Sequence, residues 1–175
     1  MKHFASAEGV YLGAWDEESL SGQAAPPLGA IEVPFPPDDA RCPWLGDRWG
    51  EVPAAPITTD DVDAERDRRI DAGVLFQDVH FQSRATDREN IAGAAQLGFM
   101  AVVAGAQPDD LRWSNPDQDF AWIASDNSLV PMDAQTVVAF GKAAAERKQA
   151  LIFAARQLKD MESIPADYTD DKWWP

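Results

Sequence analysis

The residues from Asp133 to Ser163 carry the pattern that most constrains the fold, because they read as one long amphipathic helix. Asp133 is a favourable N-cap residue, and a helix from there to Ser163 would span about 45 Å at 1.5 Å per residue. Arg147 and Lys148 interrupt the apolar stripe of this helix, so we expect half of the helix to cover a domain and half to reach beyond it. The stripe recurs at helical spacing and comprises Val137, Phe140, Ala144, Leu151, Ala155, Leu158 and Met161.

A proline-rich segment near Val52 to Thr59 divides the chain, because it offers few groups that could pack and the composition changes on either side of it. The sequence therefore predicts two domains. Residues 1–53 form a small, tryptophan-rich β module, and residues 54–175 form a domain with the long final helix. The expected fold class is α+β: a small N-terminal antiparallel β-meander joined to a domain of two β-hairpins packed on helices, with a long C-terminal helix.

Within the first module, a strand that ends at Ala5, a turn at Gly9 and an alternating strand over residues 10–15 predict a hairpin. Residues 17–29 read as a loop. The next run is expected to be an edge strand, because Pro34 lacks a backbone donor. Its apolar face comprises Ile31, Val33 and Phe35, and Trp44 and Trp49 bracket a further turn at Gly46-Asp47.

The second domain opens with a short polar helix that Thr59 should cap and Gly73 should end, with acids in its first turn and arginines in its last. A hairpin over residues 74–81 follows, although Gln77-Asp78 is not a strong two-residue turn. Thr86 and Glu89 have the spacing of a capping box for the next helix, which should stop at Gly105. One side of this helix predicts close packing through small residues: Ile91, Ala94, Ala95, Gly98, Ala101 and Val102.

The stretch from Phe120 to Met132 predicts a second hairpin, with strands over residues 120–124 and 129–132. Trp122 supplies its main apolar mass, which the last helix should cover. Asn127 supplies the turn, since asparagine tolerates the left-handed conformation. We interpret this hairpin as structural and not as a chemical site.

Charge and composition exclude several classes of function. Thirty acidic and fifteen basic residues give a net charge of −15, which repels nucleic acid phosphates and anionic lipid headgroups. A single cysteine, Cys42, excludes an internal disulfide and a CxxC metal site, and His3 and His80 lie too far apart for a histidine-rich centre. No signal peptide or membrane span is recognisable, so we expect a soluble, unsecreted chain without cofactor, metal, nucleic acid or membrane.

The same residues predict no enzyme. Cys42 lacks the sequence context of a catalytic nucleophile, and His80, between Val79 and Phe81, is expected to be a solvent-facing or hydrogen-bonded strand residue. A cell-wall hydrolase would need two carboxylates across a cleft, and no such pair is evident. The paired acids read as turns and helix caps: Asp38-Asp39, Asp60-Asp61 with Asp63, Asp109-Asp110 and Asp170-Asp171.

Tryptophans are the remaining candidates for a functional site. Trp15, Trp44 and Trp49 either form the core of the β module or face a partner protein. Trp173 and Trp174 end the chain after an acidic spacer, and two adjacent indoles there should dock, either on the last helix or on a neighbouring subunit. All five are therefore candidate partner-binding residues.

Four stretches of the C-terminal two-thirds form a familiar set: "AERDRRIDAG", "FQSRATDRENIAGAAQ", the block from Phe120 to Arg156 and the terminal "DDKWWP". With these motifs, this part of the chain resembles a phage tail-associated family known as a domain of unknown function, number 4376. The N-terminal stretch, with its Pro-Pro and its paired Trp44 and Trp49, resembles the front module of phage tail-fibre and fibre-assembly proteins. These motifs consist of turn and packing residues, and the resemblance carries over no catalytic residue.

This resemblance implies a virion component of a tailed phage, made in the host cytoplasm and located in the tail. The expected role is a structural or interaction protein near the tail tip or fibres, which joins fibre or baseplate subunits and aids host attachment. Its partners would be other phage tail or fibre proteins and further copies of itself, as a trimer if it follows the common symmetry of fibres. The alternative is a tail-fibre assembly chaperone that is absent from the mature particle.

Overall fold

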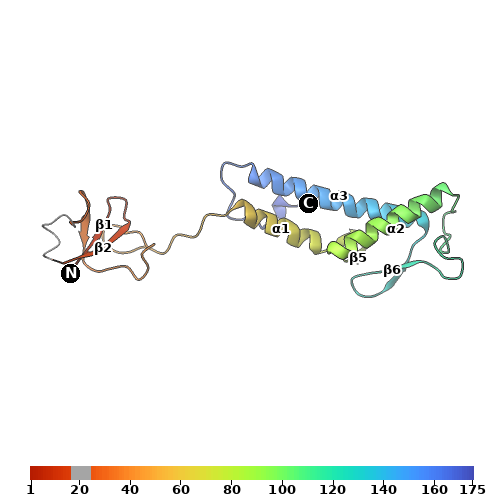
Figure 1. The fold of residues 1–175 in the computed structure, drawn as a ribbon, viewed down its shortest axis with the longest axis horizontal. Coiled ribbons are helices and arrows are strands. Elements are labelled where there is room, and N and C mark those ends of the chain that lie inside the picture. Colours follow the sequence, from red (N-terminus) through yellow and green to blue (C-terminus); the bar gives the residue numbers. More distant parts are fainter. Residues whose placement is uncertain (17–24) are drawn as a thin grey trace. The chain divides into compact units, whose positions relative to one another are not determined.

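The computed structural model describes residues 1–16 and 25–175, and it divides them into two compact units, Met1–Pro56 and Ile57–Pro175 (Figure 1). Part of the loop expected over residues 17–29 lies outside the described residues. The fold class is α+β, as predicted: the first unit contains a small antiparallel sheet, and the second contains two hairpins and three helices, the last of them long. Each unit is described by itself below.

The first unit contains a three-stranded antiparallel sheet in the order β2-β1-β3. The sheet is antiparallel as predicted, but the predicted meander was wrong, because β3 pairs with β1 and not with β2. Its strands are β1 (Lys2–Ala5), β2 (Tyr11–Trp15) and β3 (Ile31–Val33). The hairpin turn uses Gly9 at φ +86°, where a side chain would also collide with the backbone oxygen of Trp44, 2.6 Å away. β3 is an edge strand as predicted, although only Val33 of its three expected apolar residues is buried.

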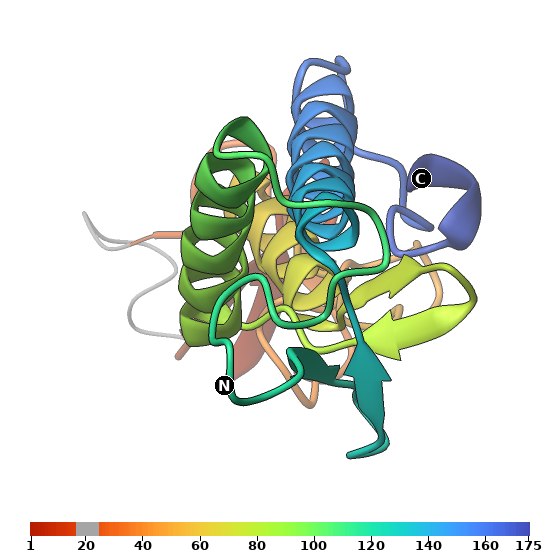
Figure 2. The same cartoon turned by 90° about the vertical axis from the view of Figure 1, so that its right-hand side faces the viewer.

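The second unit contains helices α1 (Thr59–Asp71), α2 (Ala85–Val103) and α3 (Ala134–Lys159). Two antiparallel hairpins connect them, β4 (Val74–Phe76) with β5 (Val79–Phe81) and β6 (Ala121–Ile123) with β7 (Leu129–Pro131). A short 3-10 helix, η2 (Asp171–Trp173), lies near the end. Figures 1 and 2 show α2 and α3 side by side, with the β6–β7 hairpin below them in the second view.

Local backbone chemistry explains where these elements begin and turn. Asp133 caps α3 as predicted, since its carboxylate accepts from the backbone N–H of Thr136 at 2.7 Å. The capping box predicted for Thr86 and Glu89 was wrong, because Asp87 occupies the third position of α2 and accepts from the Arg84 backbone N–H at 2.9 Å. Asn127 has φ 66° in the β6–β7 turn, as expected.

The cap of α1 also differs from the prediction by one residue. Thr58, and not Thr59, precedes the helix and forms a reciprocal capping box with Asp61. In the β4–β5 turn, Gln77 and Asp78 both have positive φ, 49° and 62°. This is the conformation of a type I′ turn, so the hairpin forms although neither residue is the usual glycine.

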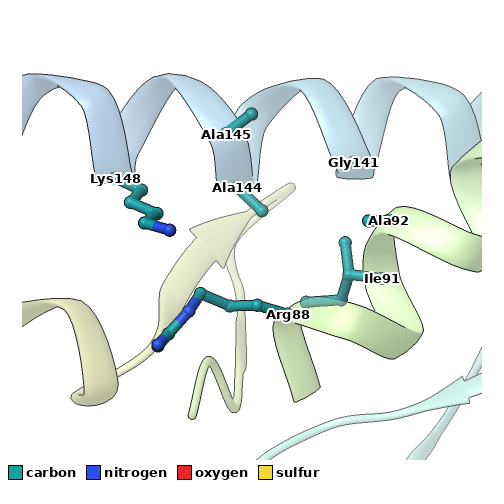
Figure 3. A pocket seen from close by; sticks show the side chains of 7 residues that line it. All are labelled: Arg88, Ile91, Ala92, Gly141, Ala144, Ala145 and Lys148. Carbon is teal, nitrogen blue, oxygen red and sulfur yellow. The ribbon is translucent and has the colours of Figure 1, made fainter. Parts of the chain in front are cut away.

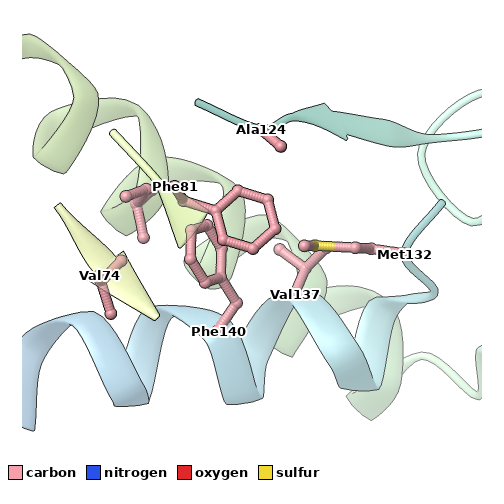
Figure 4. Packing of buried hydrophobic residues seen from close by; sticks show 7 residues of the cluster. Val74, Phe81, Ala124, Met132, Val137 and Phe140 are labelled. Atoms are coloured by element: carbon pink, nitrogen blue, oxygen red, sulfur yellow. The ribbon is translucent and has the colours of Figure 1, made fainter. Parts of the chain in front are cut away.

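The buried core of the second unit consists of two clusters that lie along α3. The first contains Phe81 and Phe140, whose ring centroids are 4.6 Å apart, and also Val74, Ile91, Ala124, Met132 and Val137 (Figure 4). The second contains Val62, Ile70, Leu151, Ala155, Leu158 and Trp174.

The expectation that half of the last helix reaches beyond the domain was wrong, because each half of α3 contributes to one of the two core clusters. The helix also ends at Lys159 and not at Ser163. Arg147 interrupts the apolar stripe because it lies between the clusters, where its Nε donates to the backbone oxygen of Gly73 at 2.9 Å. Both halves of α3 are therefore covered, one by the hairpins and α2, the other by α1 and the C-terminal segment.

Small residues bring α2 and α3 close together; the sequence predicted the close packing of α2 but not which element it packs against. A Cβ added at Gly98 of α2 would lie 3.0 Å from the backbone oxygen of Ala134, and a Cβ added at Gly141 of α3 would collide with the Cβ of Ala95. At these two glycines the backbone of one helix therefore lies directly against the other helix. This close contact fixes the rotation of α2 about its own axis. Its opposite side is consequently turned away from the core.

Candidate interaction surfaces

The tryptophans of the first unit pack on one another and on neighbouring aromatic rings. Trp44 and Trp49 face each other across an isolated β-bridge with ring centroids 5.2 Å apart, and Trp49 also meets Tyr11 edge to face at 5.6 Å. Trp15 meets Phe4 edge to face at 5.5 Å. The buried residues of this unit are Phe4, Ala5, Val33 and Cys42. All three tryptophans are half-buried, so they pack at the edge of this small core and still present part of each ring at the surface.

The C-terminal tryptophans dock on their own chain, which resolves the two alternatives left open by the sequence. Trp174 is only 7% exposed, lies in the second cluster of the core, and donates through Nε1 to the backbone oxygen of Tyr168 at 2.8 Å. This burial leaves its ring no surface to offer a partner, contrary to its candidate role. Trp173 is half-buried, and its Nε1 donates to Asp167 at 3.1 Å.

Arg69 of α1 holds this tail in place. Its guanidinium lies over the Trp174 ring at 5.2 Å from the centroid and donates to the Thr169 backbone oxygen at 2.8 Å and to Asp171 at 2.9 Å. It also donates to the buried carboxylate of Glu65 at 2.6 Å. One side chain therefore links α1 to a segment about a hundred residues further along the chain.

The Glu65 carboxylate is the electrostatic centre of this contact. Hydrogen bonds from Arg68, at 2.6 and 2.7 Å, lower the pKa of Glu65 below its ordinary value; burial opposes this shift, and Arg69 adds to it. The carboxylate is therefore ionised when folded and neutralised by two guanidinium groups. We assign it to structure, since Arg69, one of its two partners, also holds the tail.

The outer side of α2 is an apolar surface that the sequence interpretation missed. Leu97, Phe99, Met100 and Val103 are between 59% and 72% exposed and lie opposite Gly98, which faces α3. No charged residue occurs between Glu89 and Asp109. The sequence did contain a signal for this surface, because this part of the helix is apolar on all sides. Such a pattern is typical of a helix that is covered on every side. We call these four residues the α2 outer face.

Two pockets lie beside α2. The first, between α2 and α3, has a volume of about 190 Å³ and an apolar floor that includes Ile91, Gly141 and Ala144, with Arg88 and Lys148 at one end (Figure 3). Arg88 is already committed, since it donates to Asp71 at 2.6 Å and to the Ser83 backbone oxygen. This pocket is therefore a product of the small residues at the helix contact.

The second pocket, of about 520 Å³, lies between the start of α2 and the β6–β7 hairpin. Trp122 lines it and is half-buried, with its ring 5.5 Å from that of Phe140. The last helix does contact Trp122, as predicted, but the fully buried residues of this region are Ala124 and Met132. Trp122 thus packs against the core through Phe140 and also lines the pocket.

The residues considered for catalysis have structural partners. His80 is exposed on its strand, as predicted, and its Nδ1 lies 2.9 Å from the Ser125 hydroxyl, while the Ser125 backbone N–H donates to the His80 oxygen at 2.9 Å. These two bonds fasten one hairpin to the other. The Nδ1 of His3 lies 2.8 Å from the Tyr11 hydroxyl, which links β1 to β2. Cys42 is a buried free thiol.

The paired acids are used as caps, turns and ion pairs. Arg41 donates to Asp39 and lowers the pKa of that carboxyl to about 2. Asp63 pairs with Lys159 at 2.6 Å, and the Asp110 carboxylate accepts from the Arg112 backbone N–H at 2.9 Å. Over residues 1–16 and 25–175, no group of three or more acidic, histidine or cysteine side chains is arranged to hold a metal ion. In the same residues, no helix combines the length and apolarity that crossing a bilayer requires.

Comparison with known proteins identifies the family of the second unit. The family model described as a domain of unknown function (DUF4376) matches residues 53–172, which is most of the chain, and the protein belongs to this family. The match includes Arg69 of α1 and most of the tail that this residue holds. No curated protein and no solved structure matches the chain.

Proposed function

We propose that this member of the DUF4376 family is a structural interaction protein of a phage tail, located near the tail tip or fibres. In this role it joins fibre or baseplate subunits and aids host attachment, after synthesis in the host cytoplasm. The likeness of its motifs to phage tail proteins supports this proposal, and the α2 outer face is the observation that carries it. Neither a catalytic group nor a cofactor has a part in the proposed role.

The α2 outer face has the size and chemistry of a protein contact. Its four side chains expose roughly 400–500 Å², which is at the level where an exposed apolar patch of a soluble protein indicates a binding surface. Because the segment from Asn90 to Pro108 contains no charged residue, covering it would desolvate no ion. A neighbouring subunit of matching apolarity is therefore the occupant that fits best.

We propose that this neighbour is a further copy of the same chain. The net charge of −15 makes two copies repel each other over most of their surfaces, and the α2 outer face is a place where they can meet without opposing charges. A symmetric contact would bury about 1,000 Å² in total, which is near the lower limit for a specific interface. The half-buried Trp15, Trp44 and Trp49 remain a proposed second contact, directed to another tail or fibre protein.

Sedimentation analysis of the purified chain tests the self-association. We expect an oligomer for the wild type, a monomer for Leu97→Asp with Met100→Asp, and an unchanged oligomer for the control Phe153→Asp, an exposed position on α3. Salt should strengthen the wild-type association, because it screens the repulsion between like-charged copies. A wild type that stays monomeric, or a double variant that still assembles, would remove the α2 contact.

Mass spectrometry of purified phage particles tests the location. We expect this chain at stoichiometric levels in the particles. Its absence from particles that need it for fibre assembly would instead identify a tail-fibre assembly chaperone. In that case the same apolar surface would hold a fibre subunit transiently.

A further inference from the structure

The pocket between α2 and the β6–β7 hairpin has the form of a small-molecule site. Its volume of about 520 Å³ lies within the roughly 300–1,000 Å³ of typical ligand pockets. The walls come from three separate segments: Gln82 after β5, the first two turns of α2, and the hairpin with Phe120 before it. The tertiary fold therefore brings these groups together.

One wall of the pocket is aromatic and held rigidly. The ring of Trp122 packs on Phe140 at 5.5 Å, and the ring of Phe120 packs on Trp113 at 4.8 Å. Both Trp122 and Phe120 are nevertheless half-buried and line the pocket. The core thus supports these rings from one side, while the pocket retains their remaining apolar surface.

The lining also includes polar residues with unused hydrogen-bonding groups. In the part of the chain that the structure describes, the side-chain amides of Asn90 and Asn127 have no hydrogen-bond partner, and each offers donors and an acceptor. Asp87 uses Oδ2 to accept from the backbone and side chain of Arg84. Arg84 also donates to the Gln82 side-chain oxygen, which orients that residue at the pocket edge.

The charge of the pocket selects among ligands. Its lining contains one carboxylate and neither lysine nor arginine, and the chain as a whole carries −15. An anionic ligand would be repelled. The ligand that fits is neutral, with hydroxyl groups for the amides and an apolar ring face for the aromatic wall.

We infer that this pocket binds a neutral hexose residue of a glycan. The C–H face of the sugar ring lies against Trp122 and Phe120, and its hydroxyl groups bond to the amides of Asn90 and Asn127. This inference goes beyond the joining of subunits and does not depend on it, since the pocket and the α2 outer face involve different residues.

NMR titration of the full chain tests the inference, with four neutral hexasaccharides as probes: maltohexaose, isomaltohexaose, cellohexaose and mannohexaose. We expect at least one of them to shift the Trp122 indole and the Asn90 side-chain amide. Asn90→Ala should weaken that binding about tenfold. The matched control is Gln96→Ala, an exposed amide further along the same helix and outside the pocket, which should bind as the wild type does.

A second variant keeps the test decisive if Asn90→Ala does not fold. Asn127→Gly removes the other amide but preserves the turn, because glycine readily adopts the φ of 66° found there, and it should also weaken binding. The inference is overturned if none of the four saccharides shifts these signals at 10 mM. Shifts confined to another part of the chain, or wild-type affinity in both folded variants, would overturn it as well.

Discussion

Gly141→Ala should destabilise the second unit, although alanine is the better helix former. The added Cβ would collide with the Cβ of Ala95, and the Cα of Ala95 and the backbone oxygen of Ile91 follow at 3.8 Å. Relief therefore requires α2 and α3 to move apart. Overpacking of this kind costs roughly 1–3 kcal/mol, while the replacement of a helical glycine gains about 0.5–1 kcal/mol. We expect a net loss of about 1–2 kcal/mol.

Gly93→Ala is the matched control, since it makes the same exchange on the exposed side of α2, where an added Cβ has no neighbour within 4 Å. Its free energy of unfolding should rise by about 0.5–1 kcal/mol, because alanine reduces the conformational entropy of the unfolded chain. Urea unfolding followed by the helical circular dichroism signal measures both variants. The opposite signs at two helical glycines would isolate the effect of the helix contact from that of helix propensity.

A double variant tests the proposed cause directly. Ala95→Gly removes the methyl group that Gly141→Ala would strike, so the pair should show a favourable coupling of about 1–2 kcal/mol. A Gly141→Ala chain that is as stable as Gly93→Ala would refute the close approach of the helices. Strict additivity in the double variant would place the strain elsewhere.

Two further predictions concern the docked tail. Trp174→Ala should cost about 3–5 kcal/mol of unfolding free energy, because it empties a buried indole site, and the half-buried Trp173→Ala should cost clearly less in the same urea assay; equal costs would contradict the docking. Glu65 has a lowered pKa when folded, so its contribution to stability is present above its ordinary pKa and is lost as pH falls through the folded value. Glu65→Gln should flatten the fall in stability below about pH 4.5, and a slope like that of the wild type would exclude Glu65 as its source.

Local patterns predicted much of the fold, because local chemistry determines it. The N-cap at Asp133, the positive φ at Gly9 and Asn127, and the small residues along α2 each follow from the physics of a single residue or a single helix turn. The error at the start of α2 was of the same local kind, since two acids, Asp87 and Glu89, competed for one capping role. The choice between them depends on which residue is the N-cap, and in the structure this is Arg84.

Long-range contacts explain the remaining errors. Arg147 interrupts the stripe of α3 because it bonds to Gly73, 74 residues earlier, and no periodicity within the helix contains that information. Trp174 cannot serve as a partner-binding residue, because it packs in the second core cluster under Arg69. The candidate pocket was missed for the same reason: Asn90 had no visible relation to Trp122 until the hairpin folded against α2.

The helix contact separates the two binding surfaces that we propose on α2. Gly98 against Ala134 and Gly141 against Ala95 fix its rotation, so Asp87 and Asn90 near its start are held toward the hairpin pocket. The α2 outer face begins seven residues after Asn90, about 10 Å along the axis, and points away from α3. A rigid helix of this kind can place a bound saccharide at a fixed distance from a neighbouring subunit. Substitutions on the α2 outer face should therefore change assembly without altering the pocket, and loss of helix contact would disturb both surfaces together.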